Sequence, residues 1–108
     1  MMPIETTPWD PAERLTTPEA AFAYLEAAFE DGSPGIIAAA LGDIARARGM
    51  AQVAREAGLS RDALYKALRP EGNPTLETLA GITRALGFKL TVERVDNEDR
   101  ALLASAGQ

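Results

Sequence analysis

The sequence predicts an all-α fold in a single domain, and three observations support this prediction. Apolar residues recur at helical spacing in five consecutive segments. Ser or Thr precedes most of these segments and Gly follows most of them, which are the preferred residues at helix starts and just beyond helix ends. A chain of 108 residues can bury one hydrophobic core but has no room for a second domain.

The five expected helices are joined by short connections. They cover residues 18–31, 34–48, 50–57, 61–69 and 76–86. In the first helix, Phe22, Leu25 and Phe29 are expected to share the face that packs on the core. In the last helix, the corresponding apolar positions are Leu76, Leu79, Ile82 and Leu86.

A short β-strand is expected after the last helix, from Phe88 to Val95. Here the period changes from 3.6 to 2, because Phe88, Leu90 and Val92 alternate with polar residues. A lone strand leaves its backbone donors and acceptors unpaired. We therefore expect this strand to pair with a copy of itself or with the sheet edge of another protein.

Residues 53–60 predict a helix-turn-helix motif. Two steeply crossing helices need a small residue where they meet, which Ala54 supplies, and Gly58 tolerates the left-handed backbone of a tight turn. Leu59 is expected to fill the gap between the helices and Leu64 to dock the second helix on the core. The second helix is then expected to enter the major groove of DNA.

The outer face of this second helix supplies the candidate DNA contacts. It carries Ser60, Arg61, Asp62, Ala63, Tyr65, Lys66 and Arg69. Arg61, near the amino end, is the candidate for bidentate contact with guanine. Tyr65 and Lys66 are expected to reach bases or phosphates. Phosphate contacts are further expected from Gln52, Ser60, Arg46, Arg48, Arg55 and Arg69.

Structural roles remain open for several of these residues. A charged helix face is often only solvated, which would account for Arg61, Lys66 and Arg69. Asp62 near a helix amino terminus stabilises the helix dipole, and Tyr65 can be half-buried packing.

The net charge of the chain is −5, which by itself argues against a polyanionic partner such as DNA. The distribution of the charge along the chain, however, is compatible with such a partner. Residues 1–43 carry eight acidic residues and one basic residue, a net charge of −7. Residues 44–92 carry four acidic and eight basic residues, a net charge of +4. The basic part of the chain therefore coincides with the helix-turn-helix motif.

The chain is expected to comprise three parts. Residues 1–16 form an extended N-terminal arm with three prolines and Trp9, residues 17–95 form the helix-turn-helix DNA-binding domain with its C-terminal strand, and residues 96–108 form a tail. No signal-peptide pattern begins the sequence, and its longest aliphatic run is too short to span a bilayer. We expect a cytoplasmic protein that does not bind membranes.

The segment from Gly42 to Leu68 resembles the HigA-like addiction-module antidote family, an Xre-type, λ-repressor-like helix-turn-helix group. The sequences Glu71-Gly72-Asn73-Pro74 and Ala85-Leu86-Gly87-Phe88-Lys89-Leu90 extend the resemblance, which covers roughly Trp9 to Val92. It implies a five-helix domain in an antitoxin encoded beside a small basic toxin of the RelE/ParE/HigB type. Such antitoxins neutralise the toxin and, as homodimers, repress their own operon by binding an operator, which we expect to be an inverted repeat.

A cationic toxin would suit the acidic amino-terminal part of the chain. The candidate toxin contacts are Trp9, Glu19, Glu26 and Glu30. These glutamates can equally be the solvated face of the first helix, and Trp9 can be an intramolecular anchor. A stand-alone phage-type or plasmid-type Xre repressor without a toxin partner is the alternative function.

An enzymatic function is disfavoured. The chain has no Cys and no His, which excludes thiol nucleophiles, imidazole catalysis and thiolate or imidazole metal sites. A carboxylate-based hydrolase or a metal-dependent nuclease would need acidic residues that converge in a pocket, whereas those here are expected on exposed helix faces. We expect no metal and no cofactor.

Overall fold

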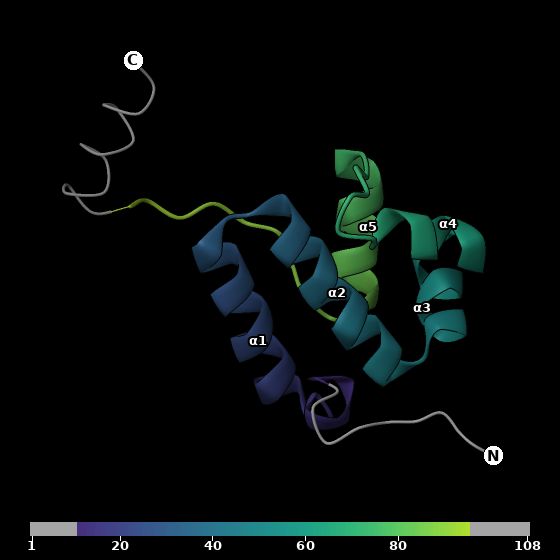
Figure 1. The fold of residues 1–108 in the computed structure, drawn as a ribbon, viewed down its shortest axis with the longest axis horizontal. Coiled ribbons are helices and arrows are strands. Elements are labelled where there is room, and N and C mark those ends of the chain that lie inside the picture. Colours follow the sequence, from purple (N-terminus) through teal and green to yellow (C-terminus); the bar gives the residue numbers. More distant parts are fainter. Residues whose placement is uncertain (1–10, 96–108) are drawn as a thin grey trace.

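A computed structural model describes residues 11–95 as a bundle of helices (Figure 1). The elements are η1 (Pro11–Arg14), α1 (Pro18–Asp31), α2 (Pro34–Arg48), α3 (Met50–Ala57), α4 (Arg61–Ala67) and α5 (Leu76–Ala85). The all-α class is confirmed. None of these helices is long and apolar enough to cross a membrane, within the part of the chain that the structure describes.

Side-chain caps fix the starts of three helices. The hydroxyls of Thr17, Ser60 and Thr75 each accept a hydrogen bond from a backbone N–H three residues ahead, at 3.0 to 3.1 Å. Each cap satisfies an amide that has no partner inside its helix, which stabilises the helix by about 1 kcal/mol. Because each contact joins residues only three positions apart, the start of each of these helices can be predicted from the nearby sequence.

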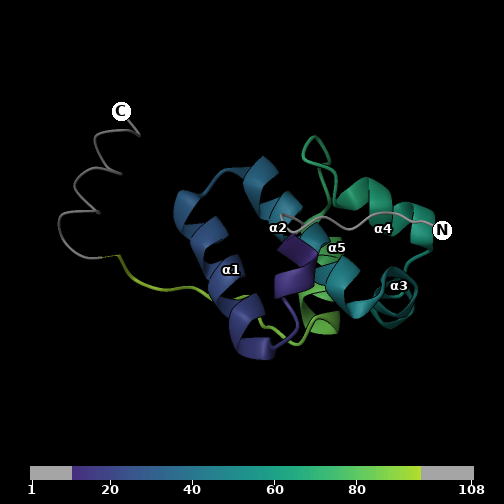
Figure 2. The ribbon, with the colours of Figure 1, turned by 60° about the horizontal axis from the view of Figure 1, so that its bottom comes forward.

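The core lies where α2 crosses the middle of the molecule. Ile44 of α2 is fully buried. It belongs to one core cluster with Leu64 of α4, Ile82 of α5 and Leu86, which follows α5 directly. In both views α1 lies at one end of the molecule and the α3–α4 pair at the other, with α2 between them (Figures 1 and 2). Surfaces on α1 and α4 can therefore serve different partners.

The strand predicted from Phe88 to Val95 is not present. Residues 88–95 are extended but belong to no strand, and no strand is found anywhere in residues 11–95. Of the alternating apolar residues, Phe88 packs on the core, whereas Val92 is 94% exposed. A strand also needs a neighbouring chain for its hydrogen bonds, and the described part of the molecule supplies only helices.

The face that α1 buries is offset from the predicted one. Ala21, Leu25 and Ala28 are buried, whereas Phe22 is 53% exposed and Phe29 is 41% exposed. Small side chains at positions 21 and 28 let α1 approach α2 closely, which turns the two phenylalanines toward the edge of the contact. Leu76, at the first position of α5, is likewise 74% exposed.

Candidate functional site

The α3–turn–α4 unit has the local geometry that its sequence predicts. Gly58 ends α3 with φ at 75°, in the left-handed region. The Leu59 N–H donates to the Ala54 carbonyl at 2.8 Å, and the Ser60 hydroxyl accepts from the Ala63 N–H at 3.0 Å to begin α4. Because these hydrogen bonds hold both ends of the turn, local contacts fix the direction of α4 relative to α3.

The outer face of α4 presents most of its candidate DNA contacts to solvent. Ala63 is partly buried, and the exposed residues are Ser60, Arg61, Asp62, Tyr65, Lys66 and Arg69. The Arg61 guanidinium lies over the Tyr65 ring, 5.9 Å from its centroid. This cation–π contact keeps the Arg61 charge at the surface, in the amino-terminal half of α4.

Asp62 forms an ion pair with Lys66, one helical turn further along α4. Its carboxylate lies 3.2 Å from the Lys66 ammonium, and both side chains are well exposed. Asp62 also lies in the first turn of α4, where a negative charge complements the helix dipole. An exposed pair of this kind is worth at most about 1 kcal/mol, so a phosphate can compete with Asp62 for Lys66.

The candidates on α3 are exposed as well. The Gln52 amide donates a hydrogen bond of 3.1 Å to the Glu56 carboxylate, one turn further along the helix. Arg55 lies beside them on the solvent side of α3. Both Gln52 and Arg55 are therefore accessible from solvent.

Arg46, near the end of α2, is held by a carboxylate. Its guanidinium pairs with Asp43 at 3.0 Å, and the other oxygen of Asp43 accepts a hydrogen bond of 2.5 Å from the Tyr24 hydroxyl of α1. Burial and the hydrogen bond to Asp43 raise the pKa of Tyr24 to about 12. The sequence analysis did not identify Tyr24 or Asp43 as site residues, although the spacing of Asp43 and Arg46, three residues apart, could have indicated their ion pair.

The Arg48 side chain reaches Gly87, beyond the end of α5. A Cβ placed on Gly87 would lie 3.9 Å from an Arg48 guanidinium nitrogen. Gly87 follows α5, where the carbonyl end of a helix attracts a positive charge. Arg48 is exposed, and its position beside the end of α5 is a structural alternative to a phosphate contact.

The three candidate toxin contacts within the described residues lie on α1. Glu19, Glu26 and Glu30 are exposed, and no ion pair joins them to a basic residue in residues 11–95. Trp9, the fourth candidate, lies outside the described residues. The structure thus separates an acidic face on α1 from the basic residues of α3 and α4.

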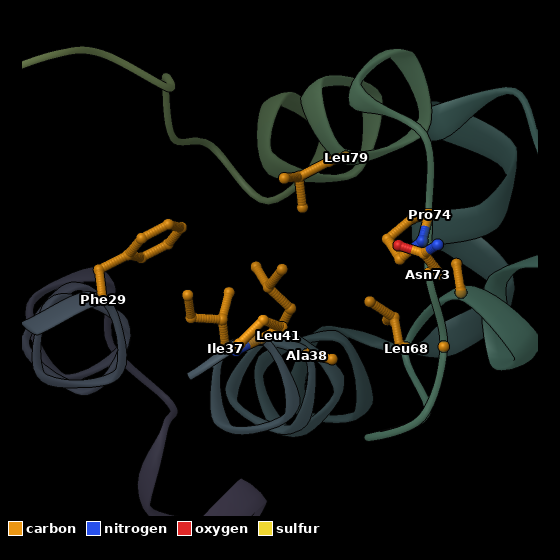
Figure 3. A pocket seen from close by; sticks show the side chains of 11 residues that line it. Phe29, Ile37, Ala38, Leu41, Leu68, Asn73, Pro74 and Leu79 are labelled. Carbon is orange, nitrogen blue, oxygen red and sulfur yellow. The ribbon is translucent and has the colours of Figure 1, made fainter. Parts of the chain in front are cut away.

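An apolar cavity of about 200 Å³ opens between α2, α5 and the loop before α5. Figure 3 shows Leu41 and Leu79 pointing into it from opposite sides, with Phe29 at one end and Asn73 at the other. Its lining includes no acidic or basic side chain. Nor do the residues 11–95 contain a group of three acidic side chains placed to hold a metal ion. Asn73 supplies the polar side chain of the otherwise apolar cavity lining.

The chain is similar to known proteins. Residues 5–94 match the model of a family described as "probable addiction module antidote protein". An uncharacterized protein of Haemophilus influenzae is 45% identical over 86 residues, which cover 80% of this chain and 89% of that protein. No solved structure matches the chain.

Proposed function

The chain belongs to the family of probable addiction module antidote proteins, and from this membership we infer that it is the antitoxin of a type II toxin–antitoxin module. The antidote part of the resemblance seen in the sequence is confirmed. The finer assignment to the HigA-like, Xre-type group is part of our proposal. So is the identity of the partner, a small basic toxin of the RelE/ParE/HigB type that the antitoxin binds and neutralises.

The acidic face of α1 supports toxin binding. Glu19, Glu26 and Glu30 are exposed and unpaired within the described residues, so they are available to a cationic partner without breaking an internal ion pair. Trp9 is proposed as a further contact on the basis of its sequence alone.

The α3–turn–α4 unit supports a second activity, in which a homodimer represses its own operon. The capped amino end of α4 and the exposed Arg61 and Lys66 fit a helix that enters the major groove. Tyr65 is proposed to contact bases, and phosphate contacts are proposed for Gln52, Arg46, Arg55 and Arg69. An inverted repeat is the operator expected for a two-fold symmetric dimer.

Co-expression with the protein encoded by the neighbouring reading frame tests the toxin half of the proposal. We expect the neighbour alone to arrest growth, and this chain to restore growth and to co-purify with the neighbour. If growth is not restored and no complex forms, the antitoxin function is wrong. Sequence-specific DNA binding that persists in that case would leave a stand-alone repressor.

A further inference from the structure

Three phenylalanines define an apolar groove beside the acidic residues of α1. Phe22 and Phe29 project from α1, and Phe88 comes from the extended segment that follows α5. The rings of Phe22 and Phe88 lie 6.3 Å apart at their centroids and are tilted by 36°. The groove between α1 and residues 88–93 has a volume of about 330 Å³. We call it the aromatic groove.

The exposure of these rings is not explained by the packing of the domain. Phe22 is 53% exposed and Phe29 is 41% exposed, although α1 buries the smaller Ala21 and Ala28 on the neighbouring face. Exposed aromatic side chains grouped on one surface are typical of protein-binding sites, because their burial supplies much of the binding free energy.

The groove suits apolar side chains better than a small polar ligand. Thr83 is the buried polar side chain of its lining, and the Thr83 hydroxyl already donates to backbone carbonyls of α5 at 3.0 Å. Small-molecule sites usually add several convergent polar groups to an apolar lining. The remaining polar lining, including Glu26, Lys89 and Glu93, is exposed to solvent.

The charge around the groove is mainly acidic, because Glu26 and Glu93 outnumber Lys89 in its lining and α1 adds further carboxylates. Helix α1 carries four acidic residues and no basic one, and two of these, Glu30 and Asp31, stand at its carboxyl end, where a negative charge opposes the helix dipole. A second copy of the chain docked through α1 would bring like charges together, which costs binding free energy. A cationic surface would be attracted instead.

The spacing along α1 also indicates the shape of the occupant. Phe22 and Phe29 are seven residues apart, which is two helical turns and about 10 Å along the axis. An amphipathic helix that presents apolar side chains at the same two-turn spacing matches this interval, with basic residues on its flanks.

We propose that the aromatic groove receives a basic amphipathic helix of the toxin, with its apolar face on Phe22, Phe29 and Phe88 and its basic residues beside Glu19, Glu26 and Glu30. This inference rests on the proposed antitoxin function and deepens it. The proposal assigns different roles to the acidic residues and to the phenylalanines. The carboxylates accelerate encounter, and the aromatic rings slow dissociation.

Binding kinetics of the purified full chain and the purified protein of the neighbouring reading frame test this division. For Phe22→Ser combined with Phe29→Ser, we expect dissociation to be at least about tenfold faster and association nearly unchanged. For Glu26→Gln combined with Glu30→Gln, we expect slower association and a weaker dependence of the association rate on salt. Leu76→Ser, which removes an exposed apolar side chain from α5, is the control and should bind like wild type.

The outcomes separate the two proposals. If wild type does not bind the neighbouring protein, the antitoxin function fails. If wild type binds and the double phenylalanine variant binds equally well, only the groove assignment fails. If that variant instead loses self-association in sedimentation while toxin binding persists, the groove receives a second copy of the chain. The charge variants keep the test decisive even if the phenylalanine variant does not fold, because unchanged association would also overturn the proposal.

Discussion

The Tyr24 hydroxyl of α1 donates a hydrogen bond of 2.5 Å to Asp43 of α2, and Asp43 also pairs with Arg46 at 3.0 Å. A contact between residues 19 positions apart thus joins the helix that carries the acidic face to the helix that carries a proposed phosphate contact. The same contact predicts how the stability of the fold depends on pH.

Tyr24→Phe should lower the free energy of unfolding at neutral pH, and this loss should disappear at strongly alkaline pH. The pKa of Tyr24 is about 12 in the folded chain against an ordinary value of 10.0, so the folded state disfavours the tyrosinate. The stabilisation is fully present below pH 10 and is lost as pH rises from 10 toward 12. Since Tyr24 is only partly buried, we expect about 1 kcal/mol. Denaturant unfolding at pH 7 and pH 11.5 measures it, and an equal difference between variant and wild type at both pH values would contradict the prediction.

Arg61→Ala and Arg46→Ala should weaken DNA binding in different ways. Arg61→Ala removes a proposed contact with a base, so we expect about 1–3 kcal/mol less discrimination between the operator and a sequence altered at that base. Arg46→Ala removes a proposed phosphate contact and should weaken binding to both sequences alike. Titration of the two DNA sequences with each variant measures this. Identical behaviour of the variants would contradict the assigned roles.

Operator binding by the proposed wild-type dimer should depend steeply on salt. If each protomer contacts three or four phosphates, the logarithm of the binding constant should fall with the logarithm of the salt concentration at a slope of about −6. Fluorescence anisotropy between low and physiological salt provides the slope. A flat dependence would mean that phosphates contribute little, and the basic surface of α3 and α4 would lose its proposed role.

Glu30→Lys should stabilise the fold while it weakens toxin binding. A positive charge in the last turn of α1 complements the helix dipole, which is worth about 0.3–1 kcal/mol and a few degrees in Tm. The same charge would repel a cationic toxin. Glu77→Lys, an exposed change in the first turn of α5, is the matched control and should lower Tm without changing toxin binding. Tighter toxin binding by Glu30→Lys would exclude a cationic contact at this position.

The helices were predictable because their boundaries depend on local chemistry. Thr17, Ser60 and Thr75 cap helices through contacts only three residues long, and Gly58 ends α3 with a positive φ that its missing side chain allows. Such signals are present in any short stretch of sequence. The α3–turn–α4 geometry could therefore be predicted without knowledge of the rest of the fold.

The errors concern contacts between distant parts of the chain. Phe22 and Phe29 were expected in the core because large apolar residues dominate the pattern, yet α1 packs on α2 through Ala21 and Ala28. The alternation after Gly87 predicted a strand, but it carries no information on whether a pairing chain exists. The bond between Tyr24 and Asp43 depends on how α1 lies against α2, which no local pattern specifies.

The central claim is that one chain binds a toxin at α1 and DNA at α4, and a single experiment in cells tests it most directly. The neighbouring protein is induced together with a reporter under the chain's own operator, and growth and reporter output are measured for three forms of the chain. We predict that wild type restores growth and represses the reporter, that Phe22→Ser with Phe29→Ser represses without restoring growth, and that Arg61→Ala restores growth with weakened repression. Folded variants that each lose both activities together, or that exchange these phenotypes, would contradict the claim.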